Sequence, residues 1–309
     1  MLGGTVISQP EPLIGINIDP GTDDPNDAFE RAAIADTHGI DLALIQDHPY
    51  IDRFFDTWML LAMIAARTDR VHLGTNVSPL PLRPLAMLAK AASTVDVLSG
   101  GRVELGIGAG GFPQGIAAFG GTMPPTSQIV PAFDEALRVI RGLWESEHGF
   151  NFSGDHYNFK GTRFGPTPAH PIRIWVGAAK PRMFRLTGRL ADGVLVSNAY
   201  VPESQLAEVN QYIDDGATRA GRTPDQIRRG YNLMGAIDLP GSPNKPADLR
   251  PSTPLLDIDG WVEHLVHLYR DCRMDTFIFW PLGERQREQL EAFAIEVAPA
   301  VRTALMGAQ

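Results

Sequence analysis

Residues 71–107 read VHLGTNVSPLPLRPLAMLAKAASTVDVLSGGRVELGI and decide the fold class. Apolar and β-branched residues over 71–76 and 103–107 predict two strands covered on both faces, which is typical of parallel sheets. Between these strands, Pro84 opens a helix and Gly100 ends it. The helix has one apolar face, formed by Leu85, Leu88, Ala92 and Val95. The stretch therefore predicts a strand–helix–strand unit with parallel strands.

The same alternation of strand and helix continues along the chain. The other six predicted strands cover residues 13–18, 42–46, 172–176, 194–197, 231–237 and 276–280. A helical pattern follows each of them, and Asp24 with Pro25 predicts the start of the first helix. Eight such units in succession predict an α/β fold, a single (β/α)8 TIM barrel spanning residues 1–309.

Three stretches are longer than ordinary connections between strands and helices. Residues 111–130 follow the fourth strand and residues 239–257 the seventh, so both belong to the C-terminal face, where barrel enzymes place their active sites. Five prolines in the second stretch predict an irregular flap. Residues 149–171 follow a helix instead, and their aromatic alternation predicts a structural hairpin on the opposite face, with His156 in it.

Composition limits the class of protein. Of 309 residues, 44% are hydrophobic and 20% charged, which suits a packed core and excludes disorder. A net charge of −9 without a basic stretch argues against a nucleic-acid or anionic-membrane partner. The single cysteine, Cys272, excludes an internal disulfide, and the longest apolar run, residues 58–66, is too short to cross a bilayer. Residues 1–12 lack a signal-peptide pattern, so we expect a cytoplasmic protein.

The strand ends of a barrel converge on one pocket, and here that ring is poor in ionisable groups. Asp47 and His48, at the end of the second strand, are the titratable pair that the sequence places there. We therefore predict neither a metal centre built from several histidines and carboxylates nor the carboxylate pair of a glycosidase. His48 is the candidate proton donor or acceptor, and Asp47 could fix its tautomer or orient its loop. The alternative is a strand-end histidine that only hydrogen-bonds the backbone.

Glycines and free amides are abundant at two strand ends. The fourth strand ends among Gly106, Gly108, Gly110 and Gly111. The fifth ends in residues 177–179 and leads into a helix that begins near Pro181, an arrangement that presents amides to a phosphate. Lys180 and Arg182 oppose the dipole of that helix, a cost that a bound anion would offset, although they could equally be solvated surface cations.

Residues 106–111 also satisfy G-x-G-x-x-G, the dinucleotide fingerprint. Phe112 and Pro113 prevent an immediate helix, and no acidic residue ends a second strand about 20 residues on. We therefore reject a Rossmann domain.

Several short motifs carry a resemblance to a known family. These are QDHP over 46–49, FDTW over 55–58, LGTNV over 73–77, LSGGR over 98–102, LGIGAG over 105–110, IWVGA over 174–178, PRM over 181–183 and GRLADG over 188–193. Together they resemble the bacterial luciferase-like monooxygenase family over nearly the whole chain.

The resemblance implies a TIM barrel that binds FMN, or the deazaflavin coenzyme F420, on its C-terminal face. It implies a non-prolyl cis peptide at Asn76–Val77 under the central ring, a phosphate site in the fifth-strand segment, and His48 beside the reacting face. The cofactor-binding residues that it implies are Asn76, Val77, Gly108, Ala109, Gly177, Ala178, Ala179, Lys180, Pro181, Arg182 and Ser197. Deazaflavin sugar-phosphate dehydrogenases of the family carry a glutamate just after the fourth-strand glycines, where this chain has Gly111, which argues against that chemistry.

On this basis we expect a monooxygenase that uses reduced FMN and oxygen on a small organic substrate, and a separate flavin reductase is a candidate partner. The first alternative is hydride transfer with F420, and the second is a flavin-binding protein without catalysis. Leu60, Met63, Phe112 and Trp280 are candidates to line an apolar substrate cavity. The helix around residues 58–66 is apolar on every side, which predicts a homodimer packed through it.

Overall fold

The computed structural model describes residues 9–241 and 253–306. Eight strands form the barrel: β1 (Leu13–Ile18), β2 (Leu42–Ile45), β3 (His72–Thr75), β5 (Val103–Gly108), β8 (Ile174–Gly177), β9 (Gly193–Ser197), β10 (Arg228–Ile237) and β12 (Thr276–Pro281). Each strand pairs in parallel with the next, and β12 pairs with β1 from Leu13 opposite Thr276 to Ile16 opposite Phe279, which closes the barrel. The predicted (β/α)8 TIM barrel is confirmed.

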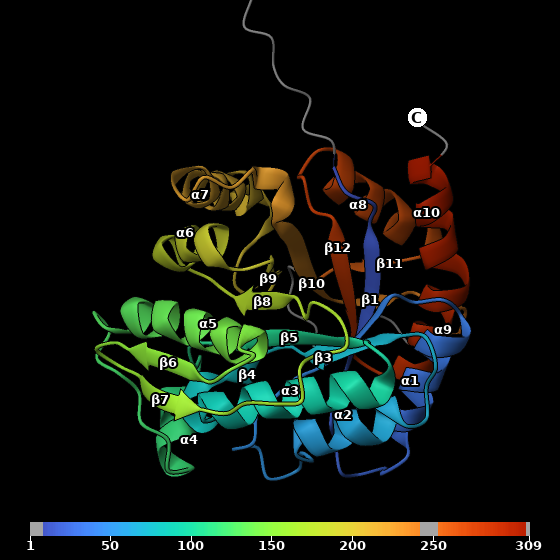
Figure 1. Ribbon diagram of the computed structural model, residues 1–309. Coiled ribbons are helices and arrows are strands. Elements are labelled where there is room, and N and C mark those ends of the chain that lie inside the picture. The colour runs from blue at the N-terminus through green and yellow to red at the C-terminus, as the bar shows by residue number, and fades with distance from the viewer. Residues whose placement is uncertain (1–8, 242–252, 307–309) are drawn as a thin grey trace, which may run out of the picture.

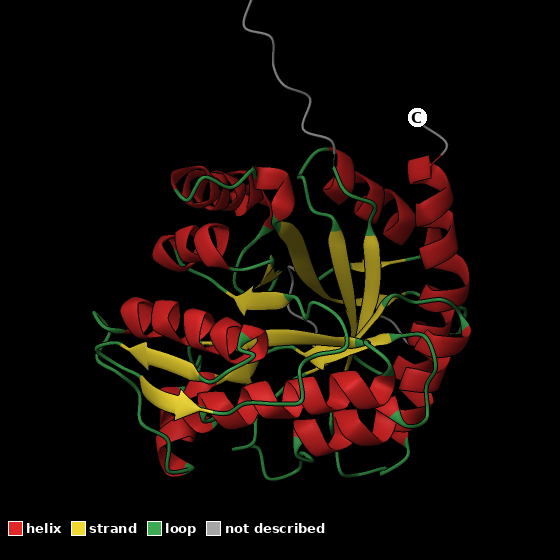
Figure 2. Cartoon of the chain, viewed as in Figure 1, coloured by secondary structure: helices red, strands yellow, loops and turns green. Residues whose placement is uncertain are grey.

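Helices surround the strands on the outside (Figures 1 and 2). They are α1 (Asp27–Thr37), α2 (Thr57–Ala65), α3 (Leu85–Ser99), α5 (Ile129–Glu145), α6 (Pro181–Leu190), α7 (Leu206–Arg219), α8 (Ile258–Arg270), α9 (Gln286–Ala292) and α10 (Ala298–Met306), with a π-helical segment (Phe293–Val297) between the last two. Short 3-10 segments cover Leu80–Leu82, Glu203–Gln205 and Pro224–Gln226. No helix among the described residues is long and apolar enough to cross a membrane.

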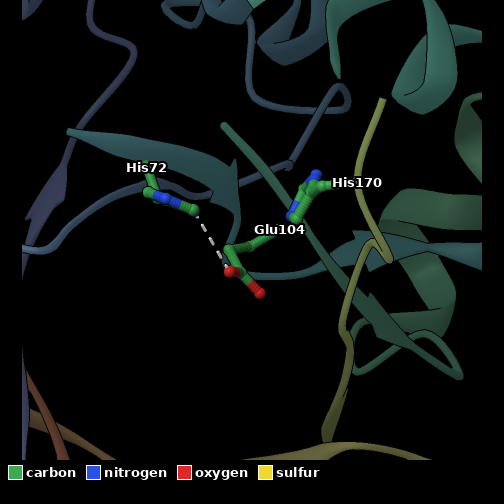
Figure 3. A group of neighbouring side chains, drawn as sticks. All are labelled: His72, Glu104 and His170. Carbon is green, nitrogen blue, oxygen red and sulfur yellow. Dashed lines mark ion pairs between the residues drawn. The ribbon is translucent and has the colours of Figure 1, made fainter. Parts of the chain in front are cut away.

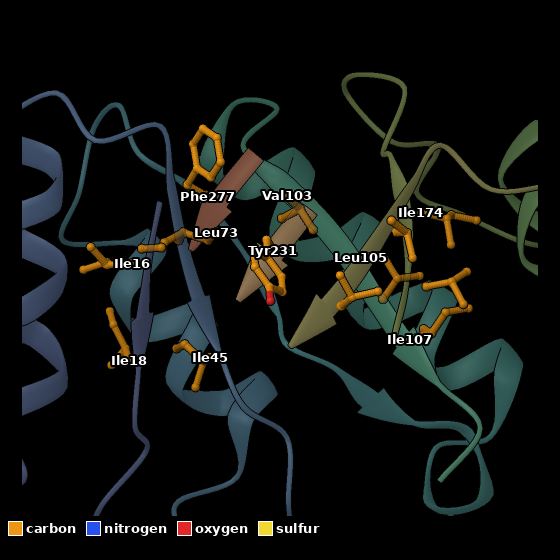
Figure 4. Packing of buried hydrophobic residues seen from close by; sticks show 14 of the residues in the cluster. Ile16, Ile18, Ile45, Leu73, Val103, Leu105, Ile107, Ile174, Tyr231 and Phe277 are labelled. Carbon is orange, nitrogen blue, oxygen red and sulfur yellow. The ribbon is translucent and has the colours of Figure 1, made fainter. Parts of the chain in front are cut away.

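The strands have two apolar layers because successive side chains alternate between their faces. The outer layer packs the strands against the helices and includes Ile16, Ile18, Ile45, Leu73, Val103, Leu105, Ile107, Ile174, Tyr231 and Phe277 (Figure 4). A second, separate cluster consists of Leu42, Leu44, Trp175, Leu195 and Ile278. A side chain at Gly193 would overlap the Trp175 ring, so glycine there makes room for the indole. Large side chains packed against glycines in this way fill the barrel interior.

The ends of two helices show how local sequence sets the boundaries. Asp24 does not cap α1; its carboxylate accepts the Asn26 amide at 2.9 Å in a turn, and the helix begins at Asp27. In contrast, α3 ends as predicted, with Gly100 in the left-handed conformation at φ 77°.

The long connections fall on the faces that the sequence predicts. Residues 111–130 contain a short helix, α4 (Pro113–Ala118). The flap predicted over 239–257 falls largely outside the described residues, but β11 (Leu255–Leu256) pairs with the end of β10. The predicted hairpin is confirmed as β6 (Phe150–Ser153) and β7 (Asn158–Thr162), an antiparallel pair beside α5.

Candidate active site

The end of β3 is shaped around Val77. The Asn76–Val77 peptide is cis, as the resemblance implies, and β4 (Ser78–Pro79) then pairs with β5. A Cβ atom at Gly108 or at Gly177 would lie only 2.7 Å from Val77 Cγ2. These two glycines also face each other in the β5–β8 register. Glycine is therefore required at both strand ends because the Val77 side chain occupies the space of their missing side chains.

Three asparagines tie the same region across the barrel. The Asn76 side-chain amide donates to Asn17 Oδ1 at 3.1 Å and to Asn232 Oδ1 at 2.9 Å, and Asn232 Nδ2 donates back to Asn76 Oδ1 at 3.0 Å. All three side chains are buried. Since they come from β1, from the end of β3 and from β10, they fix Asn76 from two sides and leave Val77 in one position.

His48 has a different partner from the one nearest in sequence. Its Nδ1 atom lies 2.6 Å from the Tyr50 hydroxyl. Burial lowers the pKa of His48, and the charge of Asp47 only partly opposes this. Burial and the same carboxylate raise the pKa of Tyr50. The pair is therefore neutral imidazole beside neutral phenol at neutral pH, a state in which the ring nitrogen not bonded to Tyr50 can accept or give a proton.

Asp47 positions the loop rather than the imidazole. It is 1% exposed and accepts from Ser78 Oγ at 2.6 Å, from Arg83 Nε at 3.0 Å and from Arg83 Nη2 at 2.7 Å. Arg83 also donates to Asp56 at 2.8 Å, and Asp56 caps α2. Two roles are predicted for Asp47. No hydrogen bond joins its side chain to that of His48 in the described structure, so it does not fix the His48 tautomer through such a bond, and its bonds to Ser78 and Arg83 are those that the other predicted role, orienting the loop, requires.

The segment after β8 leaves several backbone donors free. Within the described residues, the amides of Ala179, Lys180 and Arg182 donate no hydrogen bond, and both cationic side chains are exposed without an ion pair. Helix α6 starts at Pro181 without a side-chain cap. Free amides at the start of a ten-residue helix, beside two cations, suit a phosphate group.

The predicted site residues lie on neighbouring strands. Going round the barrel, His48 follows β2, and Asn76 and Val77 follow β3. Gly108 ends β5 and Ala109 follows it, Gly177 ends β8 and residues 178–182 follow it, and Ser197 ends β9. The Ala178 amide donates to Leu195 O at 3.3 Å, which holds the β8 end against β9. The structure thus brings the predicted residues together along one side of the C-terminal rim.

Asp19 also belongs to this rim, and the predicted set does not include it. It accepts a hydrogen bond from Gln46 Nε2 and another from Asn17 Nδ2 at 3.2 Å. Burial raises the pKa of Asp19, against the effects of Arg31, Gln46 and Trp280. The expectation that Asp47 and His48 are the titratable groups of the pocket is therefore wrong. The period of two along a strand carries the missing signal, since it places Asp19 on the same side as Asn17.

Comparison with known proteins agrees with this geometry. The sequence model of the luciferase-like monooxygenase family matches residues 9–238. The chain belongs to this family. An F420-dependent glucose-6-phosphate dehydrogenase of Gordonia bronchialis is 27% identical over 322 residues, with 90% of this chain and 94% of the relative covered. An enzyme of the same name from Intrasporangium calvum is 32% identical over 224 residues, which cover 69% of this chain and 66% of the relative.

Solved structures share the luciferase-like fold. An F420-dependent secondary alcohol dehydrogenase in complex with an F420-acetone adduct has a TM-score of 0.81 at 20% identity, over 94% of this chain and 99% of that one. EDTA monooxygenase from Chelativorans sp. has a TM-score of 0.76 at 16% identity, over 96% and 94%. Together with the family match, these findings make the chain a luciferase-like oxidoreductase.

Proposed function

We propose that the protein is an F420-dependent oxidoreductase that interconverts an alcohol and a carbonyl compound by hydride transfer. The observation that carries this proposal is the match to F420-dependent dehydrogenases along 90% of the chain. It favours F420 over FMN, the cofactor that we first expected from the sequence motifs.

The site fits a phosphorylated deazaflavin. Gly108 and Gly177 leave the Val77 side chain as a ridge on which a flat ring can rest. The free amides at the start of α6 would hold the phosphate, and Lys180 and Arg182 would meet further anionic groups of the cofactor tail. When bound, the deazaflavin supplies the carbon that accepts or releases the hydride.

The chain itself must move one proton for each hydride. In alcohol oxidation, the hydride leaves the carbinol carbon, the hydroxyl proton goes to His48 Nε2 and a C=O bond forms. Neutral His48 is ready for this role, and its Nδ1–H can donate to Tyr50 throughout. The charge of Asp47 stabilises the imidazolium that results, since it raises the pKa of His48.

We infer a small apolar alcohol, not a sugar phosphate, as the substrate from the residues that follow β5. A Cβ atom at Gly111 would meet nothing within 4 Å, so no side chain fills the place where the sugar-phosphate dehydrogenases carry glutamate. The next residue, Phe112, packs edge-on against Tyr50 with ring centroids 5.5 Å apart. An apolar ring thus lies beside Tyr50, the hydrogen-bond partner of the proposed proton acceptor.

A monooxygenase that uses reduced FMN is the second candidate, because the matching family model is that of luciferase-like monooxygenases. To separate the two, the purified protein is incubated with F420 or FMN, passed through a desalting column and examined for retained absorbance. We expect F420 to be retained, and we expect small secondary alcohols to reduce it without oxygen. Retention of FMN alone, with oxygen consumed in the presence of a flavin reductase, would overturn the proposal.

His48→Ala distinguishes an enzyme from a binding protein without catalysis. This variant is expected to retain F420, because the Val77 ridge and the α6 amides are unchanged, but to lose turnover. Equal behaviour of the variant and the parent protein in every assay would favour a non-catalytic binding role.

A further inference from the structure

A second group of functional side chains lies at the opposite end of the barrel. His72 is the first residue of β3, Glu104 the second residue of β5, and His170 precedes β8. Figure 3 shows the three side chains converging from these separate elements. His72 Nδ1 lies 3.4 Å from Glu104 Oε1, and one donor atom from each residue lies within 4.8 Å of the other two.

Two nitrogen atoms in this group make no hydrogen bond, although one of them, His72 Nδ1, lies at ion-pair distance from Glu104. His72 Nδ1 and His170 Nε2 are both buried, and neither makes a hydrogen bond in the described structure. Leaving a buried polar atom without a hydrogen bond destabilises the fold. Two histidines beside one buried carboxylate, each with a buried nitrogen that makes no hydrogen bond, indicate that a ligand belongs among them, because native proteins rarely leave such groups unsatisfied.

Asp96 prepares His170 to bind a cation. His170 Nδ1 lies 2.7 Å from Asp96 Oδ1. Asp96 is fully buried and also accepts the backbone amides of Val103, Ala169 and His170 at 3.2, 2.7 and 3.2 Å, so its carboxylate is fixed. With the proton on Nδ1, the Nε2 lone pair is free. A carboxylate behind a histidine in this way is typical of metal-ligating imidazoles.

The charges leave room for a cation. Glu104 Oε1 accepts from Arg173 Nη2 at 2.6 Å and from Arg173 Nε at 3.0 Å, and Oε2 accepts from Arg173 Nε at 3.1 Å and from the Trp175 indole at 2.8 Å, so Glu104 is held as a carboxylate. Metal binding requires the lone pairs of both imidazoles to be free, and in that state Arg173 balances one of the two buried acidic groups, Glu104 and Asp96, so that one negative charge remains. Two imidazole nitrogens and a carboxylate oxygen form a ligand set that zinc uses, with water in the fourth position.

We propose that His72 Nδ1, His170 Nε2 and Glu104 Oε1 bind a divalent transition metal ion of the zinc class. The site joins β3, β5 and the segment before β8 at the N-terminal end of the barrel. Since the candidate active site lies at the C-terminal end, the metal ion stabilises the barrel and takes no part in the reaction.

The second group of potential ligands, Glu203, His267 and Cys272, provides a matched control. There, both nitrogens of His267 already have partners, Asp271 and Glu203, each at 2.7 Å, and the His267 side chain is 45% exposed. It lacks the unpartnered buried nitrogens of the first group, so His267→Gln should leave the proposed site intact.

The test uses the full chain, freed of metal with EDTA and then desalted. Zn²⁺ is titrated by calorimetry, and Co²⁺ is added to detect the visible absorption bands of a tetrahedral site. We expect about one tight equivalent in the parent protein and in His267→Gln. We expect affinity to fall at least about 100-fold in His72→Gln and in His170→Gln, since each loses a ligand.

Thermal unfolding gives a second readout. Zn²⁺ should raise the melting temperature of the parent protein and of His267→Gln, and should leave it unchanged in the other two variants. Because both histidines are partly exposed, a folded sample of at least one variant is expected, as judged by circular dichroism. Absence of tight binding in the parent protein, or binding in both histidine variants as tight as in the parent protein, would overturn the proposal. A protonated histidine pair without metal would give the first of these results.

Discussion

His48 Nδ1 lies 2.6 Å from the Tyr50 hydroxyl, while Asp47, next to it in sequence, turns away to Arg83. The imidazole is therefore held by a neutral group, and the Asp47 carboxylate affects its pKa only by electrostatic interaction through space. This separation lets Asp47 hold the loop and affect His48 only electrostatically, and in the proposed mechanism it leaves the proton transfer to His48.

His48 sets the first prediction, on pH dependence. Burial lowers its pKa below the ordinary 6.5, so the neutral, proton-accepting form persists into mildly acidic solution. The acid limb of kcat/KM for alcohol oxidation should therefore lie below pH 6.5. His48→Ala should lower kcat by about 10²–10⁴-fold, the usual contribution of a general base.

Asp47→Asn tests whether the charge of Asp47 raises the pKa of His48. Because the Asp47 charge raises the pKa of His48, removing it should move the acid limb to still lower pH. A limb that moves to higher pH, or that stays unchanged in His48→Ala, would assign the titration to another group.

Arg83 and its two acidic partners give a prediction about stability. Asp47 is 1% exposed, so replacing Arg83 by leucine leaves a buried carboxylate unpaired and should cost about 3–5 kcal/mol. Asp56→Ala removes only the cap of α2 and an exposed ion pair, and should cost about 0.5–2 kcal/mol. Chemical denaturation of the two variants measures both losses in the free energy of unfolding. Equal losses would contradict the claim that the buried Asp47–Arg83 pair matters more than the cap of α2.

Val77 and Gly108 form a pair whose substitutions should compensate each other. Gly108→Ala places a Cβ atom 2.7 Å from Val77 Cγ2 and should cost about 1–3 kcal/mol together with cofactor retention. Val77→Ala opens that space, so the double variant should recover with a coupling energy of about 0.5–3 kcal/mol. Denaturation and F420 retention both measure this recovery.

Gly106→Ala is the matched control for that pair. Its Cβ atom would overlap the backbone carbonyl of Thr75, which cannot move as a side chain can. The same Cβ atom would also lie 3.0 Å from Val77 Cγ1, but Val77→Ala leaves the Thr75 carbonyl in place and should therefore not rescue the variant. Equal rescue of both glycine variants would show that Val77→Ala acts by making the strand ends generally more flexible, and not by opening the space at Gly108.

Much of this site is predictable from local sequence. Continuous apolar runs mark the strands to within one to three residues, and the glycines and His48 fall at strand ends where barrel pockets form. What the sequence does not indicate are contacts between distant segments. Asn76 meets Asn232 across 156 positions, and Asp47 meets Arg83 across 36. Such pairs depend on barrel closure and on loop geometry, which no periodicity encodes.

Asp19 should make stability fall as pH rises. Its pKa is raised by burial above the ordinary 3.8, so the folded state binds the proton more tightly than the unfolded chain. The folded state therefore loses stability as pH rises from 3.8 through the native pKa. Asp19→Asn removes this loss and can still accept from Gln46, so its melting temperature relative to the parent should be higher at about pH 8 than at about pH 4.

Asp36→Asn is expected to change the pH dependence of stability in the opposite direction. Burial acts to raise the pKa of Asp36, but the backbone amides of Val71, Asp69 and Arg70 outweigh it and lower that pKa. The Asp36 carboxylate thus stabilises the fold at pH values above 3.8, its ordinary pKa. The melting temperature of Asp36→Asn should therefore fall furthest below that of the parent at high pH. The same trend in both variants would mean that a global charge effect dominates.

Helix α2 leads to the last prediction, that the protein is a homodimer. Trp58, Leu60 and Leu61 are buried against the barrel, but Met59 and Met63, one turn apart, are 65% and 49% exposed. Exposed apolar side chains grouped on a peripheral helix mark an interaction surface, and a second copy of the chain covers it most simply. Light scattering should give twice the chain mass of 33.7 kDa, and Met59→Lys with Met63→Lys should give the monomer with an unchanged circular dichroism spectrum. Ile295→Lys, at an exposed apolar position of the π-helical segment, should stay dimeric. A parent protein that scatters as a monomer would rule out this interface.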